Sequence, residues 1–131
     1  MRPFQELIVW QKAHALTLEV YAVTKRFPAE ERFGLVSQLR RSCSSIPANV
    51  AEGAARATRP EFRQFLNVAM GSAAETEYHL ILARDLGYVT ASVHHPLDSK
   101  LAEVKRMLAG LRARAGEAAA PEANRQELTA R

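Results

Sequence analysis

The 131-residue chain has the length of one domain, and its 47% hydrophobic and 24% charged residues are ordinary for a globular protein. This composition excludes disordered, collagen-like and disulfide-scaffold chains, and the single Cys43 cannot form a disulfide within the chain. No apolar run approaches the roughly 20 residues that a membrane-spanning helix needs, so we expect a cytoplasmic protein without a membrane partner. The 18 Lys and Arg residues outnumber the 14 Asp and Glu residues, and the resulting net charge of +4 favours acidic partners.

Two helices are predicted in the first half of the chain from the spacing of apolar residues. From about residue 9 to residue 27 these residues recur every three or four positions, which predicts a helix closed by Pro28. The same spacing from about residue 29 to residue 55 predicts a second helix. We expect this helix to bend at Pro47, because proline lacks a backbone N–H and presses against the preceding turn.

A third helix is marked at both ends. Thr58 and Glu61 have the spacing of a capping box, and Pro60 suits the first turn of a helix. The helix is therefore predicted to begin beside Arg59. It is predicted to end at Gly87, which suits a C-terminal cap.

The rest of the chain completes an all-α fold. Residues 88–96 are expected to form a connection with at most a helical turn, and the apolar residues of 97–111 predict a fourth helix. Four amphipathic helices with short links between the first three predict an antiparallel up-down-up-down four-helix bundle over residues 1–116. Residues 117–131, which are rich in Ala and Glu and lack an apolar stripe, are expected to form a flexible tail.

The second and third helices also have a predicted register. If they fold back about residue 58, the small residues around Ser45 lie level with those around Gly71. Close approach of the two backbones would then explain a glycine in the middle of a helix, where it costs about 1 kcal/mol in helix propensity.

A structural polar network is expected between the same two helices. Asn49 and Glu52 follow the predicted bend at Pro47, where backbone groups are freed. The register places Arg41 level with Glu75. We therefore expect these four polar residues to pair within the bundle.

One end of the predicted bundle is basic. It collects seven cations and three carboxylates: Arg2, Lys12, Arg56, Arg59, Arg63, Arg112 and Arg114 against Glu6, Glu52 and Glu61. The negative ends of helix dipoles account for Arg56, Arg112 and Arg114. They do not account for Arg59 and Arg63, which begin the third helix, where free backbone N–H groups can receive an anion. The predicted nucleic-acid-binding site is Arg56, Arg59 and Arg63, flanked by Arg112 and Arg114; the alternatives are a solvated charged face and a self-association surface.

Catalytic and metal-binding motifs are missing from the sequence. It has no glycine-rich phosphate loop, His-Glu-x-x-His, Cys-x-x-Cys or Gly-x-Ser-x-Gly. A dimetal bundle is the best enzymatic alternative, because the four predicted helices each carry a central glutamate: Glu19, Glu52, Glu75 and Glu103. That chemistry needs two Glu-x-x-His units, whereas Glu75 and His79 are four apart and occur once. We expect no catalytic residues, no metal and no cofactor.

Three other features have plain structural interpretations. Cys43 lies on the predicted core stripe and is expected to be a buried apolar side chain. His94 and His95 are expected to be an exposed polar pair. Residues 70–72 resemble the turn of a helix-turn-helix motif, but the apolar pattern keeps its phase there and favours one unbroken helix.

Several short motifs are shared with a known family. They include Trp10-Gln11-Lys12-Ala13, Gly34-Leu35, Ser45-Ile46-Pro47-Ala48-Asn49-Val50-Ala51-Glu52-Gly53 and Leu86-Gly87-Tyr88. These residues resemble the bacterial four-helix-bundle family that includes proteins encoded in intervening sequences of the 23S ribosomal RNA gene. The resemblance covers residues 4 to about 112. The chain departs mildly from the pattern, with Val50 where Ile is usual and with Ser42-Cys43 where alanine-like residues are common.

The resemblance implies a homopentameric ring without enzymatic activity. A related branch, the accessory variability determinant of diversity-generating retroelements, is similar in fold and binds nucleic acid and a reverse transcriptase. The leading hypothesis is therefore a non-catalytic, oligomeric basic bundle that binds RNA or DNA through phosphates, as a ribonucleoprotein or a reverse-transcriptase accessory factor. The alternative is a protein-interaction scaffold ring with no nucleic-acid role.

Overall fold

The computed structural model describes residues 3–116 of the chain. This part contains four α-helices and two short 3-10 helices: η1 (Phe4–Glu6), α1 (Ile8–Thr24), η2 (Ala29–Glu31), α2 (Leu35–Ala54), α3 (Arg59–Asp85) and α4 (Ala91–Ala115). It contains no strand, so the all-α class is confirmed. The tail predicted for residues 117–131 lies outside the described residues.

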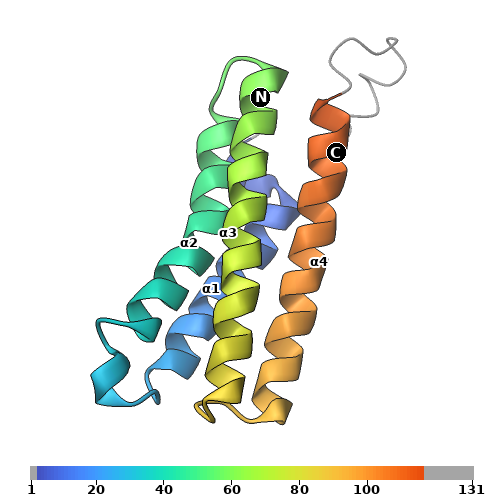
Figure 1. The fold of residues 1–131 in the computed structure, drawn as a ribbon. Helices are drawn as coiled ribbons and strands as arrows, with labels where there is room; N and C mark the ends of the chain where they lie inside the picture. The colour runs from blue at the N-terminus through green and yellow to red at the C-terminus, as the bar shows by residue number, and fades with distance from the viewer. Residues whose placement is uncertain (1–2, 117–131) are drawn as a thin grey trace.

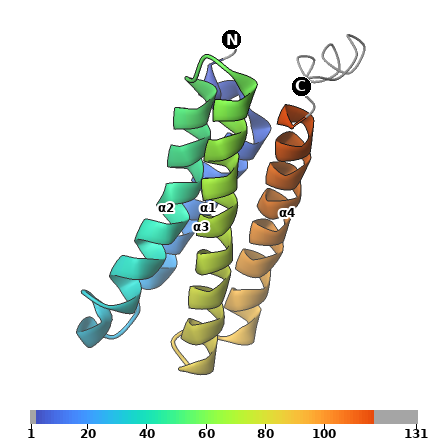
Figure 2. The same cartoon turned by 45° about the horizontal axis from the view of Figure 1, so that its top comes forward.

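The four α-helices pack side by side, and in Figure 1 the chain direction reverses from each helix to the next. α1 packs against α2 and α4, and α3 packs against the same two helices. Two ion pairs between α1 and α4 give their register, because Lys12 pairs with Glu103 and Glu19 pairs with Lys100. The view in Figure 2 shows that the start of α1, the end of α2, the start of α3 and the end of α4 share one end of the molecule.

A single hydrophobic core lies between the helices. Each helix contributes one apolar stripe, and the side chains of Leu16, Ile46, Leu80 and Leu108 are at most 1% exposed. Their removal from water supplies most of the favourable free energy of packing. Cys43 is fully buried in this core, as predicted.

The ends of α3 follow the sequence signals. The Thr58 side chain accepts a hydrogen bond from the Glu61 backbone N–H at 3.3 Å, which confirms the cap. At the other end, Gly87 has a φ of 81°, which favours glycine. The Tyr88 N–H then donates to the Ala83 carbonyl at 2.9 Å and closes the helix. α3 runs unbroken between these ends, which confirms the prediction of one continuous helix through residues 70–72.

α2 begins later than predicted. Residues 29–31 form the separate turn η2, and Gly34, with φ −106° and ψ −110°, interrupts the helical path before Leu35. None of the η2 residues is buried, and the buried apolar stripe of α2 begins at Leu35, after this break. The predicted helix start at residue 29 is therefore wrong, whereas the bend at Pro47 stays a prediction.

α4 begins earlier than predicted. The Thr90 hydroxyl accepts a hydrogen bond from the Val93 N–H at 3.3 Å and caps the helix. Pro96 lies inside α4, where its missing N–H removes the helical hydrogen bond to the carbonyl of Ser92, an exposed residue. His94 is consequently buried, only 7% exposed, which corrects the expectation of an exposed histidine pair.

A close contact between α2 and α3 lies at a different glycine from the one predicted. A Cβ atom added at Gly71 would meet no atom within 4 Å, so the packing reason proposed for that residue is wrong. A Cβ atom at Gly53 would lie 2.8 Å from the Phe65 Cβ and 3.0 Å from the Phe62 Cδ1. Gly53 therefore sets the spacing of the two helices near the turn that joins them.

Candidate nucleic-acid interface

The five predicted binding arginines lie at one end of the bundle. We call this the basic end and define it by Arg56, Arg59, Arg63, Arg112 and Arg114. Lys12, which was predicted to lie there, instead pairs with Glu103 in the middle of α4. The end of α2, the start of α3 and the end of α4 carry the five arginines, and all three helix ends lie together in Figures 1 and 2. Helix ends far apart in the sequence thus bring these arginines to the same end of the bundle.

Arg56 follows α2 and is held by two neighbours. Its guanidinium carbon lies 4.7 Å from the centre of the Phe65 ring, within the range of a cation–π contact. One guanidinium nitrogen lies 3.7 Å from a Glu52 carboxylate oxygen, and both side chains are about half exposed. An exposed pair of this length is weak. Arg56 is therefore positioned mainly by the aromatic ring.

Arg59 and Arg63 occupy the first turns of α3. Within residues 3–116 neither forms an ion pair with a carboxylate. Arg63 is exposed and lies beside the end of α4, because a Cβ atom added at Gly116 would sit 2.9 Å from the Arg63 Nε. The negative end of the α4 dipole partly offsets its charge. Arg59 lies at the positive end of α3, where Glu61 is the acidic residue of the first turn.

The end of α4 supplies the two flanking arginines. Arg112 donates a hydrogen bond to the Asn67 side-chain oxygen at 3.3 Å, which links α4 to α3 and leaves the positive charge unneutralised. The Arg114 guanidinium lies along its own helix beside Gly110. A Cβ atom added at Gly110 would lie 3.5 Å from the Arg114 Nη1, an ordinary van der Waals contact. The negative end of the α4 dipole stabilises both cations.

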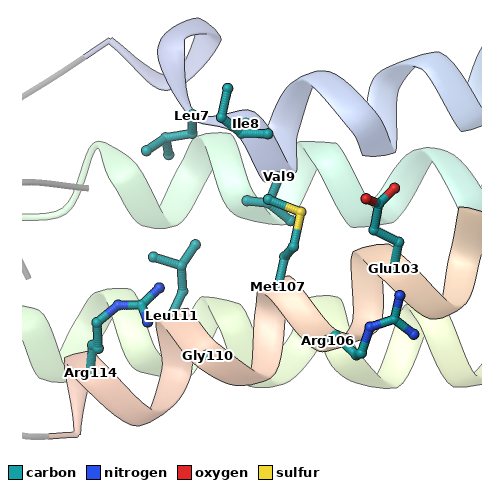
Figure 3. A pocket seen from close by; sticks show the side chains of 9 residues that line it. All are labelled: Leu7, Ile8, Val9, Glu103, Arg106, Met107, Gly110, Leu111 and Arg114. Atoms are coloured by element: carbon teal, nitrogen blue, oxygen red, sulfur yellow. The ribbon is translucent and has the colours of Figure 1, made fainter.

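A groove beside Arg114 was not predicted. It lies between the start of α1 and the last turns of α4 and has a volume of about 630 Å³. Its walls are mainly apolar, and in Figure 3 the Met107 side chain extends from α4 toward Val9 of α1. Arg106 also lines the groove. Arg106 and Arg114 are eight residues apart, which places both side chains toward one side of a helix. This spacing could have been recognised in the sequence.

The residues of the expected polar network have separate partners. Asn49 donates to the Ser45 carbonyl oxygen at 2.7 Å, within its own helix. Glu52 approaches Arg56, and Glu75 lies 3.9 Å from the His79 Nε2. Arg41 is exposed and lies close enough to His79 to act on its charge.

The buried polar contacts between α2 and α3 use other side chains. The Ser42 and Thr76 hydroxyl oxygens are 2.9 Å apart, and so are those of Ser45 and Ser72. The Ser42 hydroxyl also lies 3.3 Å from the His79 Nδ1. Burial lowers the pKa of His79 below its usual 6.5. The Ser45 contact joins two segments that the register had placed level.

The four glutamates of the dimetal alternative face outward. Their side chains are between 40% and 52% exposed, and each lies near a cationic or histidine side chain. Within residues 3–116 no group of three His, Cys, Asp or Glu side chains could hold a metal ion. The arrangement needed for a carboxylate-bridged pair of metals is therefore not formed by these residues.

The fold and the basic end together define a small all-α protein with a cluster of arginines at one end of a helical bundle. None of the helices in the described part is both long and apolar enough to cross a membrane. The chain belongs to the 23S rRNA-intervening sequence protein family, whose model matches residues 5–110. This membership confirms the resemblance seen in the sequence.

A solved structure has the same fold. It is a protein of unknown function from the S23 ribosomal protein family of Bacteroides thetaiotaomicron, with 26% sequence identity and a TM-score of 0.73. The match covers 80% of this chain and 98% of that chain. No curated protein is significantly similar to this chain in sequence. Neither the family nor the solved structure is described as an enzyme.

Proposed function

We propose that the protein is a non-catalytic, basic helical protein that binds RNA or DNA through phosphate contacts at its basic end. The observation that carries this proposal is the set of arginines that lack a carboxylate neighbour within residues 3–116, namely Arg59, Arg63 and Arg112. Guanidinium groups match phosphate oxygens in geometry and charge. A polyanion would supply the negative charge that the protein leaves unpaired there.

The start of α3 adds backbone donors to the same surface. Its first N–H groups lie at the positive end of the helix dipole, where a phosphate is favoured and a cation is disfavoured. Arg59 is the first residue of this helix. A bound phosphate would remove the repulsion between this cation and the dipole. We therefore place Arg56, Arg59 and Arg63 at the centre of the site and Arg112 and Arg114 at its edge.

We further propose that the chain acts as a homo-oligomer. The family resemblance implies that this oligomer is a pentameric ring. The outer face of α1 supports self-association, because Ile8 is 52% exposed and Leu18 is 58% exposed. Each copy would add one basic end to the assembly. Weak phosphate contacts repeated in this way bind a polymer tightly through effective concentration. The role that fits is a ribonucleoprotein component or a reverse-transcriptase accessory factor.

The proposal is tested by titrating labelled single-stranded RNA, single-stranded DNA and duplex DNA with the protein at several salt concentrations. Phosphate binding predicts that the logarithm of the association constant falls linearly with the logarithm of salt concentration. An assembly of several basic ends should give a slope of several units. Absence of binding to all three polymers at low salt would refute the proposal.

A second function is favoured by the groove beside Arg114. An apolar groove of about 630 Å³ next to the exposed Ile8 also suits a protein partner, as expected of an interaction scaffold ring. In that case the charge would serve solubility alone. An intact oligomer that ignores RNA and DNA in the same titration would favour the scaffold.

A further inference from the structure

A second, shallower slot lies at the basic end itself. It has a volume of about 470 Å³ and lies between η1, the end of α2 and the turn that leads to α3. Four alanines form much of its surface: Ala51, Ala54, Ala55 and Ala57. Pro3, Phe4 and Arg56 complete its lining. The slot is thus a small apolar surface with one aromatic ring and one cation.

The aromatic side of the slot is held in place by its neighbours. The Phe4 ring centre lies 5.1 Å from that of Trp10, at an interplanar angle of 65°. Trp10 is in turn stacked on His14 at 4.9 Å. This edge-to-face contact fixes η1 against α1. The slot therefore exists before any ligand arrives.

The cationic side of the slot is also fixed. Arg56 is packed over Phe65, and its Nε is buried without a hydrogen-bond partner among residues 3–116. The contact with Glu52 is long, at 3.7 Å, and is made by a different nitrogen, Nη2. A guanidinium held in this way beside an apolar surface favours a ligand that pairs a negative charge with a flat apolar group.

We infer that this slot receives an unpaired base of single-stranded nucleic acid, while Arg56 and Arg59 hold the adjoining phosphates. The inference rests on the proposed function and specifies its substrate as single-stranded. A nucleotide joins an anionic phosphate to a flat aromatic base, and Arg56 and the apolar lining of the slot complement these two groups. Bases of a duplex are stacked inside the helix and cannot enter, whereas bases of a single strand stack readily on aromatic side chains.

The test compares oligonucleotides that differ only in their bases. A labelled 12-nucleotide single strand and an abasic strand of equal length and charge are titrated at one salt concentration, as both DNA and RNA. Base stacking predicts that the strand with bases binds about tenfold more tightly or better. Equal affinity of the two strands would overturn the slot and leave the phosphate proposal standing. Failure of both strands to bind, with duplex DNA still bound, would overturn the slot alone, and failure of duplex DNA as well would overturn both proposals.

A second test fills the slot with a larger side chain and compares this variant with a matched control. Ala55→Leu adds a side chain inside the slot, and Ala48→Leu adds the same side chain at an exposed position of α2 outside it. We expect Ala55→Leu to reduce the preference for the base-carrying strand to less than about twofold, and Ala48→Leu to retain it in full. Circular dichroism of both variants checks that they are equally folded. A folded Ala55→Leu protein that still prefers bases would refute the inference.

Discussion

Ser42 and His79 connect α2 to α3 inside the bundle, with the Ser42 Oγ 3.3 Å from the His79 Nδ1. The imidazole is only 5% exposed, and the Thr76 hydroxyl lies 2.9 Å from the same serine oxygen. Burial lowers the pKa of His79, against the opposing effect of Glu75 on the same helix, while Arg41 of α2 adds to the lowering. The folded protein therefore favours the neutral imidazole.

This lowered pKa predicts a loss of stability in mild acid. Above the usual pKa of 6.5, His79 is neutral in both the folded and the unfolded states. As the pH falls through that value, the unfolded chain binds the proton first, so the free energy of unfolding decreases until the pH reaches the folded-state pKa. Urea unfolding between pH 8 and pH 5 should show a smaller decrease for His79→Gln than for the unmodified protein.

The exposed His95 provides the control for this measurement. His95→Gln should leave the pH dependence of the free energy of unfolding nearly unchanged. Equal pH dependence in the His79→Gln and the unmodified protein would show that the buried imidazole does not control acid sensitivity.

Replacement by alanine should change the free energy of unfolding in opposite directions at Gly53 and at Gly71. Gly53→Ala places a Cβ atom 2.8 Å from Phe65 and should lower the free energy of unfolding by about 1–3 kcal/mol. Gly71→Ala meets nothing within 4 Å and should raise the free energy of unfolding of the isolated bundle by up to about 1 kcal/mol, through helix propensity. Urea denaturation of both variants at low protein concentration measures this difference. Equal effects would contradict the close helix contact at Gly53.

Cys43 should be unreactive in the folded protein. Its side chain is fully buried, and burial raises the pKa of the thiol to about 11. A thiol-specific reagent at pH 8 needs the exposed thiolate. We expect no labelling of the native protein within the time in which denatured protein is labelled completely. Rapid labelling of the native protein would show that the core around α2 opens readily.

The sequence predicted helices well where local chemistry alone decides their ends. The Thr58 cap and Gly87 determined α3 because each satisfies backbone groups through its own side chain or conformation. The starts of α2 and α4 were predicted wrongly because they depend on more than local chemistry. A break at Gly34 depends on the turn before it, and Pro96 is tolerated near the start of α4, five residues after its first residue, Ala91.

The gathering of the arginines at one end of the bundle was predictable, whereas their contacts were not. Antiparallel packing of helices was sufficient to bring Arg59, Arg63 and Arg112 to one end of the bundle. The partners of individual side chains were not predictable, because they depend on rotamers and on distances of a few ångströms between helices. The slot beside Phe4 also required the path of η1, a 3-10 turn too short to give a periodic pattern.

The most direct test of the nucleic-acid proposal reverses charges at the two ends of the bundle. The double variant Arg59→Glu, Arg63→Glu changes the basic end, and Lys25→Glu, Arg26→Glu makes the same charge change at the exposed end of α1, at the opposite end of the bundle. We measure the binding of labelled single-stranded RNA and DNA at one low salt concentration, with the oligomeric state checked by light scattering. The proposal predicts that the first variant loses binding while its oligomer stays intact, and that the second keeps most of its affinity. Unchanged binding in the first variant, or equal losses in both, would contradict the placement of the site at the basic end.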